Sequence, residues 1–129
     1  MKGIQAYLIV GAGAAIGASL RFFINELAKK SLTSAIPWAT FGINVAGSLC
    51  LGLFMGLMQR HNFASQWQLF IAVGLLGGFT TFSTFSAESV ALLRQSNVLG
   101  FAVYVFGSNA LGIAGAALGY WLTKPAAAI

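Results

Sequence analysis

The ten residues from Gly77 to Ser86 bring together two glycines, five hydroxyl side chains and three phenylalanines inside an otherwise apolar segment. In the hydrocarbon of a bilayer every polar group needs an internal partner, so hydroxyls are tolerated where they are buried in protein or face water. Two adjacent glycines followed by threonines also weaken helix propensity, and an unwound turn at Gly77 and Gly78 would release carbonyl oxygens toward a cavity. The run therefore predicts an ion or solute site at a break in a membrane helix.

Phe82 and Phe85 are three residues apart, so they share a face if the helix resumes after the break. Aromatic residues at this spacing often pack in a core or face lipid, which is one interpretation of the pair. The other interpretation uses the positive edge of each ring, which can face an anion. The hydroxyls of Ser83 and Thr84 would then add hydrogen-bond donors to the same site.

Five further polar residues fall within apolar segments: Arg21, Asn44, Glu88, Tyr104 and Ser108. Such groups are costly in a membrane and are therefore functional candidates. Tyr104 also fits an interfacial anchor, and Ser108 also fits a hydrogen bond between helices. Neutral donors inside the protein, with a single cation near a span end, favour a path for anions over a path for protons or metals.

The composition of the 129-residue chain is that of an integral membrane protein, because 58% of the residues are hydrophobic and only 7% are charged. Soluble domains carry about 25% charged residues. At about 20 residues a span, the chain accommodates an all-α fold of four transmembrane helices, with the third helix broken. We expect a single channel domain over residues 1–129, with spans at about 4–26, 37–58, 68–91 and 99–122.

The N-terminal segment has an alternative interpretation as a secretory signal peptide. Lys2 precedes an apolar run, and Ala12, Gly13 and Ala14 have the small-residue spacing of a cleavage site. The apolar character continues to Ile24, which is longer than a signal peptide requires. We therefore favour a first transmembrane span.

The net charge of +5 would indicate nucleic acid binding in a soluble protein, but in a membrane protein it bears on topology. Four spans place three basic side chains at each end of the bundle. One end carries Lys2, Arg60 and Lys124, and the other carries Lys29, Lys30 and Arg94. Without a difference between the ends, the positive-inside rule gives no preferred orientation. The sequence therefore predicts insertion in both directions and an antiparallel homodimer, with no nucleic-acid partner.

The remaining composition argues against an enzyme. The chain has no aspartate, two glutamates and one histidine, so it lacks the paired carboxylates, zinc motif or nucleophile-base pair that enzymes of these types need. Its sixteen glycines instead include pairs spaced four apart, which bring helix backbones close together. These pairs are Gly13/Gly17, Gly52/Gly56, Gly74/Gly78 and Gly115/Gly119.

The run from Gly77 to Glu88, with Asn44 in Ile43-Asn44-Val45-Ala46-Gly47 and Arg21 in Gly17-Ala18-Ser19-Leu20-Arg21, resembles the Fluc (CrcB) fluoride channels. The resemblance covers all four spans, and the third-span motif is highly specific. It implies a dual-topology homodimer in the bacterial inner membrane, with two antiparallel fluoride pores. It also implies a structural sodium ion at the centre of the interface.

The resemblance further implies a role for each candidate residue. Phe82 and Phe85 would meet fluoride with their ring edges, and Asn44 would donate to the ion nearby. Ser83, Thr84 and Glu88 match the polar track of the family, and Tyr104 and Ser108 match its fourth-span pore residues. Arg21 would draw anions into the vestibule, and the backbone carbonyls of Gly77 and Thr80 would hold the sodium ion. Gly112 departs from the pattern, because some relatives have a serine there.

The implied function is passive export of fluoride from the cytoplasm, which requires neither an ATP site nor a coupling carboxylate. Two other classes remain open. A small dual-topology proton-coupled exporter would need a titratable carboxylate deep in the membrane, whereas Glu26 and Glu88 lie toward span ends. A membrane assembly protein that transports nothing would explain the glycines but not the ordered phenylalanine and hydroxyl motif.

Overall fold

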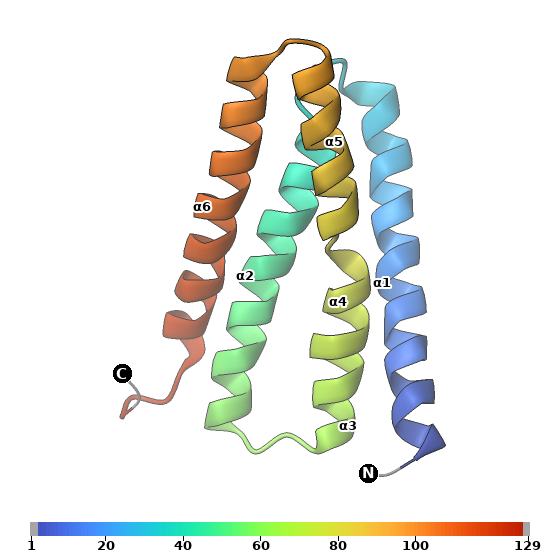
Figure 1. The fold of residues 1–129 in the computed structure, drawn as a ribbon. Coiled ribbons are helices and arrows are strands. Elements are labelled where there is room, and N and C mark those ends of the chain that lie inside the picture. Colours follow the sequence, from blue (N-terminus) through green and yellow to red (C-terminus); the bar gives the residue numbers. More distant parts are fainter. Residues whose placement is uncertain (1–2, 128–129) are drawn as a thin grey trace.

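The computed structural model describes residues 3–127, which form a bundle of helices (Figure 1). In chain order the elements are α1 (Ile4–Ser31), α2 (Trp38–Arg60), α3 (Ser65–Gln68), the π-helical stretch η1 (Leu69–Leu76), α4 (Gly77–Phe79), α5 (Phe82–Arg94) and α6 (Val98–Thr123). Four stretches are long and apolar enough to cross a membrane: Ile4–Ser31, Trp38–Arg60, Ser65–Arg94 and Val98–Thr123. The prediction of an all-helical, multi-pass membrane protein is confirmed.

The first helix extends beyond the predicted span. The apolar run suggested an end near residue 26, but α1 continues to Ser31 with Lys29 and Lys30 in its last turn. Basic side chains are favourable at a helix C-terminus, where the backbone dipole is negative. Lys29 also pairs with Glu26 at 2.6 Å, one turn earlier on the exposed surface. These interactions continue the helix after the hydrophobic pattern has stopped.

Glycines bring α1 against the first half of the third span. A Cβ atom on Gly17 would overlap the carbonyl oxygen of Leu75, and one on Gly78 would lie 2.6 Å from the carbonyl oxygen of Ala14. Gly13 and Gly74 face each other in the same seam, where the Cβ of Gly74 would lie 3.0 Å from the Cα of Gly13. No side chain fits between these backbones, so the predicted close packing of these pairs is confirmed.

A second glycine seam joins α2 to α6. A Cβ atom on Gly52 would overlap the carbonyl oxygen of Ala116, and one on Gly119 would overlap that of Leu49. Gly115 is less tightly enclosed, because its nearest atom would be the carbonyl oxygen of Val45 at 3.5 Å. The two seams pair the helices as α1 with the third span and α2 with α6.

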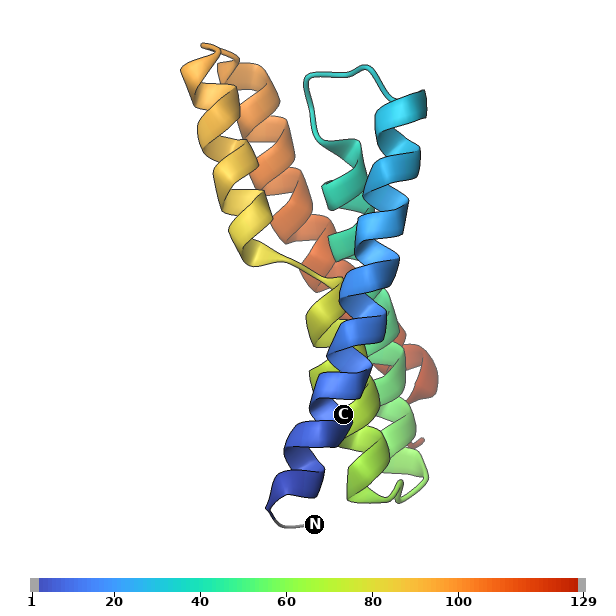
Figure 2. The same ribbon diagram turned by 90° about the vertical axis from the view of Figure 1, so that its right-hand side faces the viewer.

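The helical dihedral angles of the third span are interrupted at two threonines. Thr80 (φ −78°, ψ 158°) and Thr81 (φ −150°, ψ 120°) are extended between α4 and α5. Figure 2 shows α5 leaving the line of α4 after this connection. The expectation that Gly77 and Gly78 themselves unwind is wrong: Gly77 is helical (φ −64°, ψ −38°) and Gly78 lies inside α4. Gly78 is held in the helix by its close contact with α1.

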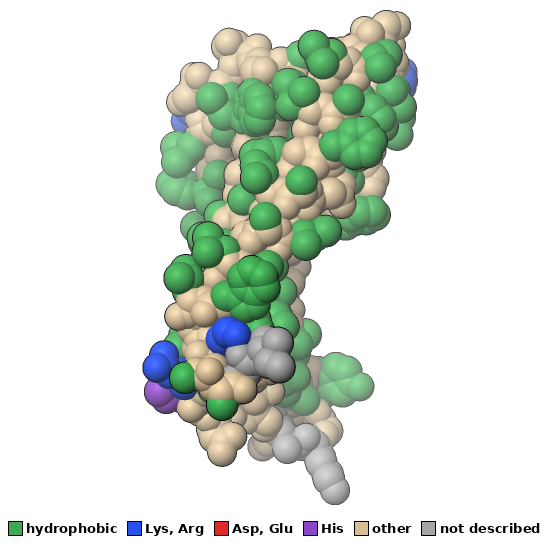
Figure 3. Space-filling view, turned by 90° about the vertical axis from the view of Figure 1, so that its left-hand side faces the viewer, with side chains coloured by type: hydrophobic (Ala, Val, Ile, Leu, Met, Phe, Trp, Pro, Cys, Tyr) green, Lys and Arg blue, Asp and Glu red, His purple; other side chains and the backbone are tan. Residues whose placement is uncertain are grey.

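The connections divide between the two ends of the bundle (Figure 1). The first turn of α1, the last turn of α6 and the loop 61–64 lie at one end, and the loops 32–37 and 95–97 lie at the other. Arg60 and Lys124 therefore belong to one end, and Lys29, Lys30 and Arg94 to the other, as the sequence predicted. Lys2 lies outside the described residues. Figure 3 shows a face on which basic side chains appear toward the ends and not across the middle.

Candidate functional site

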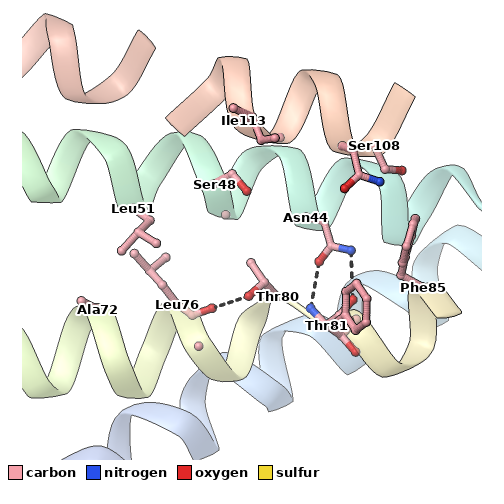
Figure 4. Close-up of a pocket in the computed structure, with 15 residues that line it drawn as sticks. Asn44, Ser48, Leu51, Ala72, Leu76, Thr80, Thr81, Phe85, Ser108 and Ile113 are labelled. Carbon is pink, nitrogen blue, oxygen red and sulfur yellow. Dashed lines mark hydrogen bonds between the residues drawn. The ribbon is translucent and has the colours of Figure 1, made fainter. Parts of the chain in front are cut away.

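The side chain of Asn44 holds the interruption of the third span from α2. Its Oδ1 accepts a hydrogen bond from the backbone N–H of Thr81 at 2.8 Å, and its Nδ2 donates to the carbonyl of Thr81 at 3.0 Å (Figure 4). In a continuous helix the Thr81 N–H would bond to the carbonyl of Gly77. The amide of Asn44 thus replaces a helical partner and fixes the direction of the extended segment.

The side chains of Thr80 and Thr81 close the two helix ends that meet at the interruption. The hydroxyl of Thr80 donates to the carbonyl of Leu76 at 3.0 Å, at the end of α4. The hydroxyl oxygen of Thr81 accepts from the backbone N–H of Thr84 at 3.3 Å, which caps the N-terminus of α5. Ordinary helix capping therefore accounts for part of the hydroxyl run.

A cavity of about 340 Å³ opens beside the interruption, between α2, the third span and α6. Six of the predicted site residues line it: Asn44, Gly77, Thr80, Phe82, Phe85 and Ser108. Ser48, Asn109 and Gly112 are further lining positions, and none of the lining side chains is charged. Figure 4 shows Asn44 and Phe85 on opposite sides of the space near Thr81. The cavity is thus lined by aliphatic side chains, phenylalanine rings and neutral polar groups.

Three aromatic rings form a row that begins at the cavity wall with Phe82 and Phe85 and ends at Tyr104. The ring centroids of Phe82 and Phe85 lie 5.6 Å apart, and those of Phe85 and Tyr104 lie 5.2 Å apart. The planes are tilted by 37° and 38°, so the rings are not stacked flat. Phe82 is 78% exposed in the single chain, whereas Tyr104 is fully buried. The row runs from the open surface into the helix packing, and burial of Tyr104 argues against an interfacial anchor.

The carboxyl group of Glu88 lies at the inner end of the aromatic row. The hydroxyl of Tyr104 donates to its Oε2 at 2.7 Å, and the hydroxyl of Thr40 donates to its Oε1 at 3.0 Å. Thr40 is 1% exposed and was not among the predicted site residues. Its spacing carried a signal, because Thr40, Asn44 and Ser48 follow one another at intervals of four along one face of α2.

Ser108 has a buried hydroxyl without a partner. Among the described residues, its Oγ is the buried side-chain oxygen or nitrogen that makes no hydrogen bond. Ser86 and Ser89 instead donate to the carbonyls of Phe82 and Phe85 in their own helix. A buried hydroxyl left unpaired costs about 1–3 kcal/mol. Its position at the cavity wall makes Ser108 a donor available to a ligand, rather than a hydrogen bond between helices.

Other predicted site residues lie away from the cavity wall. Ser83 is exposed, and Thr84 accepts a hydrogen bond from the Thr81 hydroxyl at 3.1 Å. The Nε of Arg21 donates to the carbonyl of Gly78 at 3.3 Å, near the C-terminal end of α4. Tyr104 and Glu88 connect to the cavity through the ring of Phe85.

Comparison with known proteins finds one family that matches most of the chain. The family model described as CrcB-like protein, Camphor Resistance (CrcB), matches residues 8–120. A protein of Thermus thermophilus is 42% identical over 93% of this chain and 94% of its own length. One from Phocaeicola vulgatus is 36% identical over 94% of this chain and its full length. One from Methylobacterium nodulans is 46% identical over 84% of this chain and 87% of its own length. All three relatives are named fluoride-specific ion channel FluC.

Proposed function

Because the chain belongs to the CrcB-like family, we propose that it is a fluoride channel, as its relatives are named. It is a multi-pass membrane protein and not an enzyme. We further propose that fluoride leaves the cytoplasm passively through the cavity beside Thr81. Hydrogen fluoride enters cells as a neutral weak acid and dissociates inside. A membrane potential that is negative inside, worth about 2.3 kcal/mol per charge per 100 mV, then drives the anion outward.

The observation that carries this proposal is the unpaired Ser108 hydroxyl beside the ring row of Phe82 and Phe85, in a cavity without charged walls. Fluoride is small and strongly hydrated, so it can leave water only where hydrogen-bond donors replace its hydration shell. Hydroxyl and amide protons supply strong donors, and ring edges supply weaker positive surface. In the proposed path, Asn44 and Ser108 donate from opposite helices, while Phe82 and Phe85 face the ion with ring edges.

The remaining predicted residues take supporting positions in this proposal. Glu88 and Tyr104 continue the polar track from Phe85, and Ser83 and Thr84 belong to its outer side on α5. Glu88 accepts two hydrogen bonds, so it orders Tyr104 and Thr40. Arg21 contributes the positive potential that attracts anions near the interruption.

Fluoride efflux from liposomes tests the function directly. Purified protein is reconstituted into vesicles loaded with potassium fluoride, valinomycin sets the potential, and a fluoride electrode records release. We expect rapid release that does not need a proton gradient and is far faster than release of chloride. A proton-coupled exporter would require the gradient, and an assembly protein would leave the fluoride trapped. Either result contradicts the proposal.

We propose that the functional unit is an antiparallel homodimer with two pores. Phe82 lines the cavity and is largely exposed in the single chain, so this wall of the cavity is open to a partner subunit. The balanced basic residues at the two ends support insertion in both orientations. A tag at the C-terminus should then be accessible from both sides of the membrane in intact cells. Labelling from one side only would contradict the antiparallel arrangement. Two lysines added to loop 32–37 should make most chains insert with that loop in the cytoplasm.

We also propose a structural sodium ion at the dimer axis, held by the backbone carbonyls of Gly77 and Thr80 from both subunits. The residues present are compatible with such an ion. The Thr81 N–H that would bond to the Gly77 carbonyl is engaged by Asn44, so this oxygen lacks its helical partner. The described residues contain no cluster of His, Cys, Asp or Glu able to hold a metal. Neutral oxygens alone suit a hard monovalent cation better than calcium or magnesium.

Exchange of sodium for a large organic cation tests the sodium proposal. Dimer stability in detergent should fall in N-methylglucamine and return when sodium is restored. Indifference of both assembly and flux to sodium would defeat this proposal without affecting the fluoride path. We place the dimer in the inner membrane of a bacterium, since the relatives named above come from bacteria. Fractionation of cells that express a tagged chain would test that location.

A further inference from the structure

Ser48 is a second cavity hydroxyl that makes no hydrogen bond among the described residues. It lies on α2 one turn after Asn44, half-buried, and it lines the cavity together with Ser108 (Figure 4). Serines within helices commonly donate to the carbonyl four residues earlier. Ser86 and Ser89 do so here, at 3.0 Å and 2.7 Å, but Ser48 does not. Its hydroxyl proton is therefore uncommitted.

The hydroxyl of Ser48 faces a position of α6 where the cavity wall lacks a side chain. Gly112 follows Ser108 by one helical turn and lines the same cavity. A Cβ atom built on Gly112 would lie 3.6 Å from the Ser48 Oγ and would meet no other atom within 4 Å. Ser48 thus presents a polar group next to the gap that Gly112 leaves in the α6 wall.

We propose that Ser48 is a hydroxyl donor of the anion path, and that it continues the row formed by Asn44 and Ser108 past Gly112. The inference rests on the proposed fluoride function and assigns one more residue to it. An anion moving along a neutral wall needs a donor within reach at each step, because an undonated stretch would return the full cost of dehydration. Along α6 that stretch begins at Gly112, and the donor comes from α2 instead.

A transfer of the hydroxyl between the two helices tests this assignment. In the liposome efflux assay, Ser48→Ala should lower fluoride release about tenfold, the effect of one hydrogen bond to a charged group. The double variant Ser48→Ala/Gly112→Ser should recover most of that loss, because the open space at residue 112 accepts a Cβ and its hydroxyl lies beside the old one. Ser89→Ala is the matched control, since its hydroxyl is already committed to the Phe85 carbonyl. That control should conduct at the wild-type rate.

The outcomes separate the inference from the proposed function. No fluoride release by the wild-type chain would contradict the channel itself. If the wild type conducts, release by Ser48→Ala at the wild-type rate overturns the role of Ser48. A loss that Gly112→Ser does not restore overturns it as well, because the hydroxyl would then not be the group that matters. Size-exclusion profiles matching wild type establish that each variant is assembled.

Discussion

The two halves of the third span differ in how they contact their surroundings. Before the interruption, η1 and α4 press against α1 through Gly17, Gly74 and Gly78, where backbone meets backbone. After it, α5 presents Phe82 and Phe85 to open space, with Phe82 78% exposed. The two residues of the interruption therefore separate a half that packs through its backbone from a half that contributes side chains to the cavity. Asn44 joins the halves through its two hydrogen bonds to Thr81.

This difference separates what holds the protein together from what a ligand would meet. Lipid tails are as apolar as the helix side chains, so there is no hydrophobic driving force between membrane helices, and close packing of their backbones is a main source of association energy. An added carbon in the glycine seam should therefore affect assembly. A changed side chain on α5 should affect the passage of ions while the bundle stays intact.

The largest effect is expected for Gly17→Ala. Its Cβ would overlap the Leu75 carbonyl, and backbone atoms cannot move aside as a flexible side chain does. We expect destabilisation of about 3 kcal/mol, the upper part of the range for overpacked cores, with loss of the monodisperse peak on size-exclusion chromatography. Gly11→Ala on the same helix is the control, because its Cβ would meet nothing within 4 Å. Equal behaviour of the two variants would contradict the seam.

Asn44→Asp should produce the next largest effect. A carboxylate cannot donate to the Thr81 carbonyl as the amide does, and it places negative charge where the proposed path holds an anion. Like charges in contact cost several kcal/mol, so fluoride efflux from liposomes should fall about 100-fold on that principle. Asn62→Asp adds the same charge in the exposed loop before α3 and should conduct normally. Wild-type flux in Asn44→Asp would remove Asn44 from the path.

Replacement of either cavity phenylalanine by isoleucine should reduce flux less, by about tenfold, because only the positive ring edge is lost. The protein should assemble normally, since isoleucine is apolar and keeps much of the volume of either ring. Phe106→Ile is the matched control, because Phe106 is 70% exposed on α6 and does not line the cavity. Efflux measured together with a size-exclusion profile distinguishes a loss of conduction from a loss of assembly. Undiminished flux in both variants would assign Phe82 and Phe85 to packing alone.

The sequence allowed prediction of features that depend on residues near one another in the chain. Hydropathy located four spans, and spacing by four identified glycine pairs such as Gly13 with Gly17. Each of these patterns lies within one helix. Phe82 and Phe85 could also be assigned to one face from spacing alone, and their rings do lie side by side.

Contacts between helices could not be read from the chain. Thr40 and Glu88 are 48 positions apart, and their hydrogen bond exists because α2 and α5 pack near each other. The role of Gly78 was misjudged for the same reason. Glycine is compatible both with unwinding and with close packing, and only the position of Ala14 on α1 decides between them. Ser48 was not predicted as a site residue, because its proposed role depends on the missing side chain at Gly112 in another helix.

The smallest effect is expected when a helix cap is removed, and the chain offers two caps of similar geometry for comparison. Thr81 caps α5 by accepting from the Thr84 N–H at 3.3 Å, and Asn97 caps α6 by accepting from the Gly100 N–H at 2.9 Å. Loss of either side chain in Thr81→Ala or Asn97→Ala should lower stability by about 1 kcal/mol, measured by thermal unfolding in detergent. The caps should nevertheless differ in efflux, because α5 begins at the cavity and carries Phe82 in its first turn, whereas α6 begins at a loop. A loosened α5 should move the ring edges and slow fluoride release two- to threefold, a ratio equivalent to about half of that cap energy. If Thr81→Ala and Asn97→Ala have the same flux, the start of α5 does not position the rings. The difference between the two halves of the third span would then be a difference in packing only.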